Sequence, residues 1–198
     1  MELKVSPRLI DRIFTSRRTT GVGTSSRRVE IAGSPVTVGA LVLSNFGGRE
    51  HLRVDGVPVG RLVAGRFAHV PRRPAAGSIV VLVATDAPLL SRQLERLCRR
   101  SALAIGRLGG FAANNSGEVV LAWSTSNRVP RARMLHVHTV EIVLDLELDP
   151  LFEATIDAVE EAVLNALCAG VPTRGPGDHE APALPLDLTR SLCARYRP

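Results

Sequence analysis

Aromatic residues are scarce, and their scarcity limits the kinds of partner that the chain can bind. Phe, Trp and Tyr together make up 4% of the 198 residues. Single-strand nucleic-acid binding uses aromatic stacking platforms, and phosphate backbones require a clustered basic face. Here the net charge of +6 comes from arginine pairs that are scattered along the chain, such as Arg17-Arg18 and Arg99-Arg100. We therefore expect no nucleic-acid partner.

Metal-binding and disulfide motifs are absent as well. The three cysteines, Cys98, Cys168 and Cys193, form no CxxC pair, and their odd number does not favour a disulfide framework. His136 and His138 alternate along one predicted strand but have no third ligand nearby. We expect reduced, mostly buried thiols, no metal and no cofactor.

Long hydrophobic runs are also missing. No run reaches the roughly 18 uncharged apolar residues of a membrane span, and the start, Met1-Glu2-Leu3-Lys4, lacks the apolar centre of a signal peptide. A hydrophobic content of 45% can nevertheless bury the core of one domain. These features predict a single domain over residues 1–198, in the cytoplasm and without membrane contact.

Four apolar stretches predict strands. Residues 79–85 follow a small-residue loop, and their β-branched side chains disfavour a helix. Because this run is apolar at nearly every position, it predicts a strand that is covered on both faces. Residues 36–44 predict a second buried strand, and residues 119–125 predict another apolar strand. The alternation over residues 140–148 predicts a strand with one wetter face.

Two helices are expected between and after these strands. Asp86-Ala87-Pro88 predicts a helix start, and helical spacing then continues to Gly109-Gly110. Asp149-Pro150 begins a second helix, which Gly170 ends. Residues 20–26 predict a tight turn, residues 68–77 an exposed linker, and the segment after Pro172 an irregular path.

Four polar residues at strand ends are candidate site residues. Ser78 begins the strand over 79–85, where a nucleophilic hydroxyl would be held rigidly but open to the loop. The amide of Asn45, at a strand exit, could donate to an oxyanion. Ser116 and Glu118 stand two apart at a strand entrance, so both can point to one face. A turn residue or a solvated side chain is the commoner explanation of each position, so the residues alone leave both interpretations open.

Residues 77–89 (GSIVVLVATDAPL) resemble the self-cleaving segment of the L-aminopeptidase/D-amidase-esterase and β-peptidyl aminopeptidase family. Other segments are similar to that family in the same order, and together they span about residues 20–190: they are residues 21–27, 45–47, 56–60, 115–118, 124–127 and 151–167.

This resemblance implies an α/β fold, a partial αββα sandwich similar to N-terminal-nucleophile hydrolases. It also implies a cut between Gly77 and Ser78, giving pieces 1–77 and 78–198. Ser78 would then be a terminal nucleophile with its own amine as base. Ser116 and Glu118 would orient that amine, and Asn45 would stabilise the oxyanion. The implied activity is that of a serine aminopeptidase or amidase, which releases N-terminal amino acids from peptides, amides or esters.

The chain departs from the family before Gly21. Family members carry a long segment there, whereas this chain has twenty residues, so the resemblance covers the family's C-terminal half. The family's tyrosine beside the oxyanion site has no equivalent, because Tyr196 is the only tyrosine. We therefore expect a homo-oligomer or a complementing N-terminal chain. The alternative is a non-catalytic remnant or interaction domain.

Overall fold

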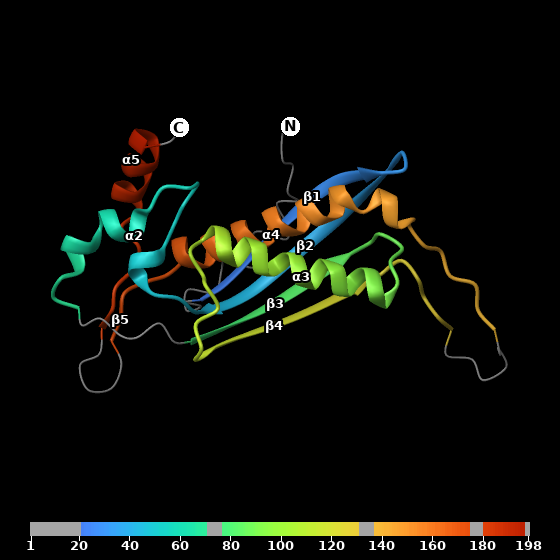
Figure 1. Cartoon of the computed structure of the whole chain (residues 1–198), viewed down its shortest axis with the longest axis horizontal. Helices are drawn as coiled ribbons and strands as arrows, with labels where there is room; N and C mark the ends of the chain where they lie inside the picture. Colours follow the sequence, from blue (N-terminus) through green and yellow to red (C-terminus); the bar gives the residue numbers. More distant parts are fainter. Residues whose placement is uncertain (1–20, 71–76, 131–136, 175–179, 197–198) are drawn as a thin grey trace.

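A four-stranded sheet forms the centre of the computed structural model, which describes residues 21–70, 77–130, 137–174 and 180–196. The strands are β1 (Val22–Ile31), β2 (Ser34–Asn45), β3 (Gly77–Thr85) and β4 (Ser116–Ser124), in that spatial order. β2 pairs antiparallel with β1 and with β3, whereas β3 and β4 are parallel. The α3 helix (Ser91–Arg107) makes the connection that a parallel pair requires (Figure 1).

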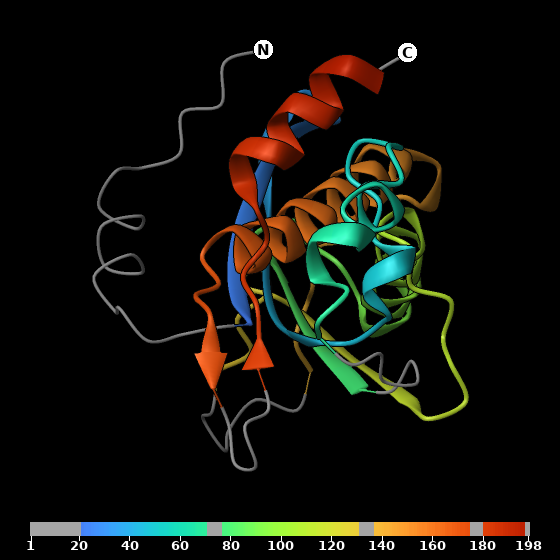
Figure 2. The same ribbon diagram turned by 90° about the vertical axis from the view of Figure 1, so that its left-hand side faces the viewer.

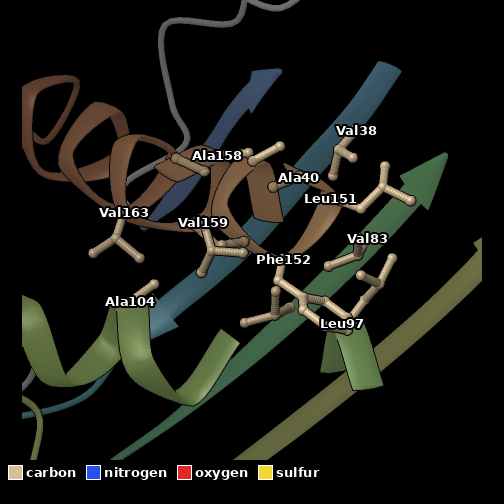
Figure 3. Close-up of a cluster of buried hydrophobic side chains, with 14 of the residues drawn as sticks. Val38, Ala40, Val83, Leu97, Ala104, Leu151, Phe152, Ala158, Val159 and Val163 are labelled. Atoms are coloured by element: carbon tan, nitrogen blue, oxygen red, sulfur yellow. The ribbon is translucent and has the colours of Figure 1, made fainter. Parts of the chain in front are cut away.

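Two helices cover one face of this sheet. The α3 helix and the longer α4 helix (Asp149–Cys168) lie side by side over the strands (Figures 1 and 2). The hydrophobic core lies between these helices and the sheet, and burial of each of its Val, Leu or Phe side chains contributes roughly 1.5–3 kcal/mol. Figure 3 shows its main members: Val38, Ala40, Val83, Leu97, Ala104, Leu151, Phe152, Ala158, Val159 and Val163.

The α4 helix approaches β1 closely because Gly23 has no side chain. A Cβ atom at this position would lie 1.9 Å from the carbonyl oxygen of Ala162 and 2.6 Å from the backbone nitrogen of Ala166. Polar contacts hold the same interface, since Arg27 forms an ion pair with Glu161. At the other side of α4, Arg107 of α3 contacts Asp157 and Glu160, and the hydrogen bond to Glu160 raises the pKa of Arg107.

The opposite face of the sheet is open and apolar. Along β3, Ile79, Val81 and Val83 are fully buried beneath the helices, whereas the alternate residues point to the other side. The register puts the following side chains on that side, which we call the open face: Leu41, Leu43, Val80, Leu82, Val119, Leu121 and Trp123. Val119 and Leu121 are 60% and 58% exposed. The described residues thus form one helical layer on one sheet, which is half of an αββα arrangement.

Smaller elements gather near the end of the sheet where β3 begins. They are two 3₁₀ turns, η1 (Arg49–His51) and η2 (Ala64–Phe67), the short α2 helix (Val59–Leu62), the β5 and β6 pair (Thr173–Arg174 and Glu180–Ala181) and the α5 helix (Leu186–Tyr196). The α5 helix lies beside α2 (Figures 1 and 2). A second small core forms there, where Leu192 and Cys193 of α5 pack against Val57, Val59 and Val63. Within the described ranges, no helix is long and apolar enough to cross a membrane.

The regular stretches of the prediction are confirmed. The strands over 36–44, 79–85 and 119–125 correspond to β2, β3 and β4, and the helix from Asp149 corresponds to α4. The expected burial of β3 on both faces is wrong for the described chain, because only the helix side is covered. The sequence pattern of a strand indicates whether one or both of its faces are apolar. It does not indicate whether the same chain or another polypeptide covers each face.

Several irregular stretches were predicted wrongly. Residues 22–26 belong to strand β1 rather than a tight turn, because pairing with β2 and packing against α4 outweigh their small side chains. The α3 helix begins at Ser91 and not at Asp86, whose carboxylate instead accepts a hydrogen bond from the backbone nitrogen of Thr37 (2.6 Å).

The segment over 140–148 pairs with no strand among the described residues, and its last part is the 3₁₀ turn η3 (Asp145–Glu147). The segment after Pro172 includes the α5 helix rather than only an irregular path. Val70, in the expected exposed linker, is buried, and residues 71–76 of that linker lie outside the described residues. Cys168 is exposed and the other two thiols are partly exposed, so they are not mostly buried.

Replacement of Gly23 tests the close packing of α4 on β1. Gly23→Ala forces a methyl group against helix backbone, so we expect the free energy of unfolding in urea to fall by about 1–3 kcal/mol or more. The matched control is Gly39→Ala on β2, where the nearest atom to an added Cβ is 3.9 Å away. Equal stabilities of the two variants would contradict this account of the interface.

Candidate active site

The strand register brings all four candidate residues to one end of the sheet. Ser78 is paired with Asn45 across the antiparallel β2–β3 ladder. On its other side, the parallel β3–β4 ladder pairs Gly77 with Ser116 and Ser78 with Gly117. Adjacent strands lie about 4.8 Å apart, so these residues are direct neighbours. The sequence predicted the residues, and the register explains how segments 33 to 71 positions apart meet.

The Ser78 hydroxyl lies at the peptide bond that precedes it. Its Oγ atom donates a hydrogen bond to the Gly77 carbonyl oxygen at 2.8 Å, and the side chain is exposed. Gly77 has a φ of +141°, and a Cβ atom there would lie 1.9 Å from the carbonyl oxygen of Asn45. Only glycine therefore permits the close approach of β2 that sets Asn45 beside Ser78.

Ser116 and Glu118 form the pair that their spacing predicts. The Ser116 Oγ atom donates to Oε1 of Glu118 at 2.9 Å. Glu118 is exposed and Ser116 is half-buried, so the carboxylate stays accessible to a second donor. The pair can hold a cationic group, since a charged carboxylate and a hydroxyl oxygen both accept hydrogen bonds.

The pleat divides the four residues between the two sides of the sheet. Ser78 and Asn45 occupy register positions on the open face, together with Val80 and Leu43. Glu118 is paired with Ile79, whose side chain is buried beneath the helices, so Glu118 belongs to the helix side. A group that lies in the plane of the sheet at the start of β3 is therefore flanked by the hydroxyl on one side and by Ser116 and Glu118 on the other.

Gly117 is a contributor to the site that sequence reasoning did not single out. A Cβ atom on Gly117 would lie 3.4 Å from the Ser78 Oγ atom, so the absent side chain leaves space around the hydroxyl. The available signal was its place between the two polar candidates, Ser116 and Glu118. Without the register, however, nothing in the sequence set Gly117 opposite Ser78.

A pocket of about 220 Å³ lies near this end of the sheet but does not contain the candidate residues. It is lined mostly by apolar groups, including Phe46, Val63, Phe67 and Leu167. Ser44 and Phe46, the neighbours of Asn45, line it, whereas Ser78, Ser116 and Glu118 do not. The polar constellation, and not this pocket, is the candidate reaction site. Among the residues that the structure describes, no three His, Cys, Asp or Glu side chains are grouped to hold a metal ion.

Most of this chain is similar to known proteins. The model of the family described as Peptidase family S58 matches residues 14–181. The β-peptidyl aminopeptidase BapA of Sphingosinicella microcystinivorans is 39% identical over 189 residues, covering 89% of this chain and 48% of the relative. The chain thus spans about half the length of the curated relatives it matches.

Solved structures show the same partial coverage. The PH0078 protein of Pyrococcus horikoshii OT3 is 42% identical with a TM-score of 0.80, over 91% of this chain and 49% of that one. The L-aminopeptidase D-Ala-esterase/amidase of Ochrobactrum anthropi, described as a variant of the Ntn hydrolase fold, is 38% identical with a TM-score of 0.79. That match covers 89% of this chain and 48% of that one. The described part of the chain therefore has about half of an Ntn-hydrolase fold, as the resemblance implied.

Replacement of Gly77 tests the contact between β2 and β3 at the site. Gly77→Ala places a methyl group against backbone atoms, at a φ that residues with a side chain rarely adopt. We therefore expect the free energy of unfolding, measured in urea, to fall by more than about 1 kcal/mol. Gly106→Ala is the control, because an added Cβ in that helical position meets nothing within 4 Å. A Gly77→Ala protein as stable as the control would argue against the tight approach.

Proposed function

The chain belongs to peptidase family S58, and on that premise we propose that it is a self-processing serine aminopeptidase or amidase with Ser78 as nucleophile. Its substrates would be peptides, amides or esters with a free N-terminal amino group. The observation that carries the proposal is the register that groups Asn45, Gly77, Ser78 and Ser116 at one end of the sheet.

The proposed first step is cleavage of the chain itself. The Ser78 Oγ atom attacks the carbonyl carbon of Gly77 and its proton passes to the departing Ser78 nitrogen, so that an ester replaces the amide. Water then hydrolyses the ester, leaving a Gly77 carboxylate and a Ser78 with a free hydroxyl and a free amine. The 2.8 Å contact between Oγ and the Gly77 oxygen supports this step, because the attacking atom already lies at the scissile bond.

The new terminal amine would then serve as the base. A free α-amine has a pKa of about 7.7–8.0, so part of it is unprotonated at neutral pH and can take the proton of the hydroxyl. Departure of Gly77 vacates the position opposite Ser116, and the amine remains beside that position. Ser116 and Glu118 would hold the amine, and the Asn45 amide would donate to the oxyanion on the open face.

The open face supports a further part of the proposal, which concerns the partner. The described chain covers one side of its sheet, and about half the length of the curated relatives has no counterpart in it. We propose that a polypeptide equivalent to that other half covers the open face and closes the substrate site over Ser78. The same apolar face also favours the second candidate function, a non-catalytic interaction domain.

Autoproteolysis is expected between Gly77 and Ser78. Ser78→Ala should abolish it, Ser78→Cys should retain part of it because a thiol is a competent nucleophile, and Asn45→Ala should slow it by about 10²–10³-fold. Intact mass and N-terminal sequencing after incubation measure these outcomes. The control is Ser34→Ala, at an exposed serine that begins β2. If the wild type stays uncut both alone and with a co-expressed complementing half, the proposal of an enzyme is refuted in favour of a non-catalytic interaction domain.

The chain without a partner is expected to bind a fluorescent apolar dye and to self-associate. The double variant Val119→Thr/Leu121→Thr should reduce dye binding, because it removes apolar groups from the open face. Leu103→Thr, an equally exposed position on α3, should leave dye binding nearly unchanged. A wild-type protein that is a compact monomer without dye binding would contradict the proposed partner surface.

A further inference from the structure

An extended segment leaves the body of the molecule at the end of the sheet away from Ser78. Residues 126–130 lead outward from β4, and residues 137–144, which we call the returning leg, lead back to η3 and α4 (Figure 1). The returning leg has apolar residues at every second position from Val140 to Leu144, as a strand with one apolar face does, although it pairs with no strand among the described residues. Its apolar row is exposed, with Val140 at 40%, Ile142 at 47% and Leu144 at 69%.

One edge of the returning leg is already satisfied by the body of the molecule. The Asn127 amide both donates to the Glu141 carbonyl (2.8 Å) and accepts from the Glu141 nitrogen (3.0 Å). Two residues on, Val143 donates to the carbonyl of Pro88 (2.9 Å) and accepts from the buried side chain of Gln93 (2.7 Å). These bonds hold the leg in place as a strand would be held.

The other edge of the leg is free. In an extended chain, the N–H and C=O groups of one residue point to one edge and those of the next residue to the other. Glu141 and Val143 use the inner edge, so Val140 and Ile142 present their backbone groups outward. Within the described residues, neither of these two has a hydrogen-bond partner. An ordered, unpaired, apolar strand edge is a template for pairing with another chain.

We propose that the returning leg pairs antiparallel with the same leg of a second copy of this chain. A two-fold axis through Ile142 pairs Ile142 of one copy with Ile142 of the other. It also pairs Val140 of each copy with Leu144 of the other copy. Apolar residues would then oppose each other across the new pair. In the same register Glu141 faces Val143, so no two carboxylates meet.

The neighbouring registers are disfavoured by charge. A shift that centres the axis on Glu141 sets two glutamates against each other, and one centred on Val143 sets Glu141 against Asp145. Like charges directly opposite one another destabilise a strand pair. The leg is therefore self-complementary in the register centred on Ile142. This interface lies away from the proposed reaction site, and its test depends on no activity.

Cross-linking through a single new cysteine tests the register directly. In full-length Ile142→Cys, the two new cysteines would face each other across the two-fold axis, so mild oxidation should give a disulfide-linked dimer. A digest of that dimer without reduction should contain the peptide of residue 142 joined to a second copy of itself. Leu103→Cys, also exposed, and the wild type with its three free thiols control for random linkage. Absence of the self-linked peptide, or equal linkage in Leu103→Cys, would overturn the proposal.

A second measurement reads the size of the assembly without a cross-link. Ile142→Pro removes an outward N–H that bonds to nothing in the described chain, so it should disrupt the pairing edge and leave the fold intact. The measurement is made in the Val119→Thr/Leu121→Thr background, which weakens association through the open face. There, sedimentation velocity should show half the mass of the protein that keeps Ile142, with unchanged circular dichroism, and Ile142→Lys should do the same. Leu103→Lys in this background should keep the full mass. The full mass in both Ile142 variants would refute the pairing.

Discussion

The whole arrangement depends on the burial of one row of side chains from each strand beneath α3 and α4. Val38, Val81 and Val83 are fully buried in this layer, and their burial fixes which residues of neighbouring strands are paired. The same register places Asn45 and Gly117 beside Ser78. A slip by one residue would turn Ser78 toward the helices and the valines toward solvent, so the core that stabilises the fold also positions the hydroxyl.

The parts of the fold that the sequence could predict are those whose pattern reports a buried face. The β3 run and the α4 stripe have such patterns, and both elements are found where expected. Strand β1 has none, because its core-facing positions include Gly23, Ser25 and Arg27, which pack closely against α4 or bond to it. The returning leg shows the converse. Its pattern indicates an extended chain, but its hydrogen-bond partners are the Asn127 amide, the carbonyl of Pro88 in a loop and the buried Gln93 side chain, and none of them belongs to a strand.

The candidate residues were found by their places at strand ends and by family resemblance, whereas their spatial relation came only from the structure. Ser116 and Glu118 stand two apart in one strand, so their position on one face was predictable from spacing, and the structure adds the hydrogen bond between them. The approach of Asn45 to Gly77 was not, since it depends on the pairing of two strands and on a glycine that admits a backbone oxygen. The division of Ser78 and Glu118 between the two sides of the sheet likewise requires the register.

A break between Gly77 and Ser78 would not separate the two resulting polypeptides. Strands β1 and β2 would belong to one polypeptide, and the strand after Gly77, β4, α3 and α4 would belong to the other. Strand β2 nevertheless pairs with β3 along its length, from the pair Val38 and Thr85 to the pair Asn45 and Ser78. The α4 helix of the second polypeptide also packs across β1 and β2 of the first. Both polypeptides contribute side chains to one core, so neither has a complete hydrophobic interior without the other. Scission would therefore change the covalent structure of the molecule while its tertiary structure persists.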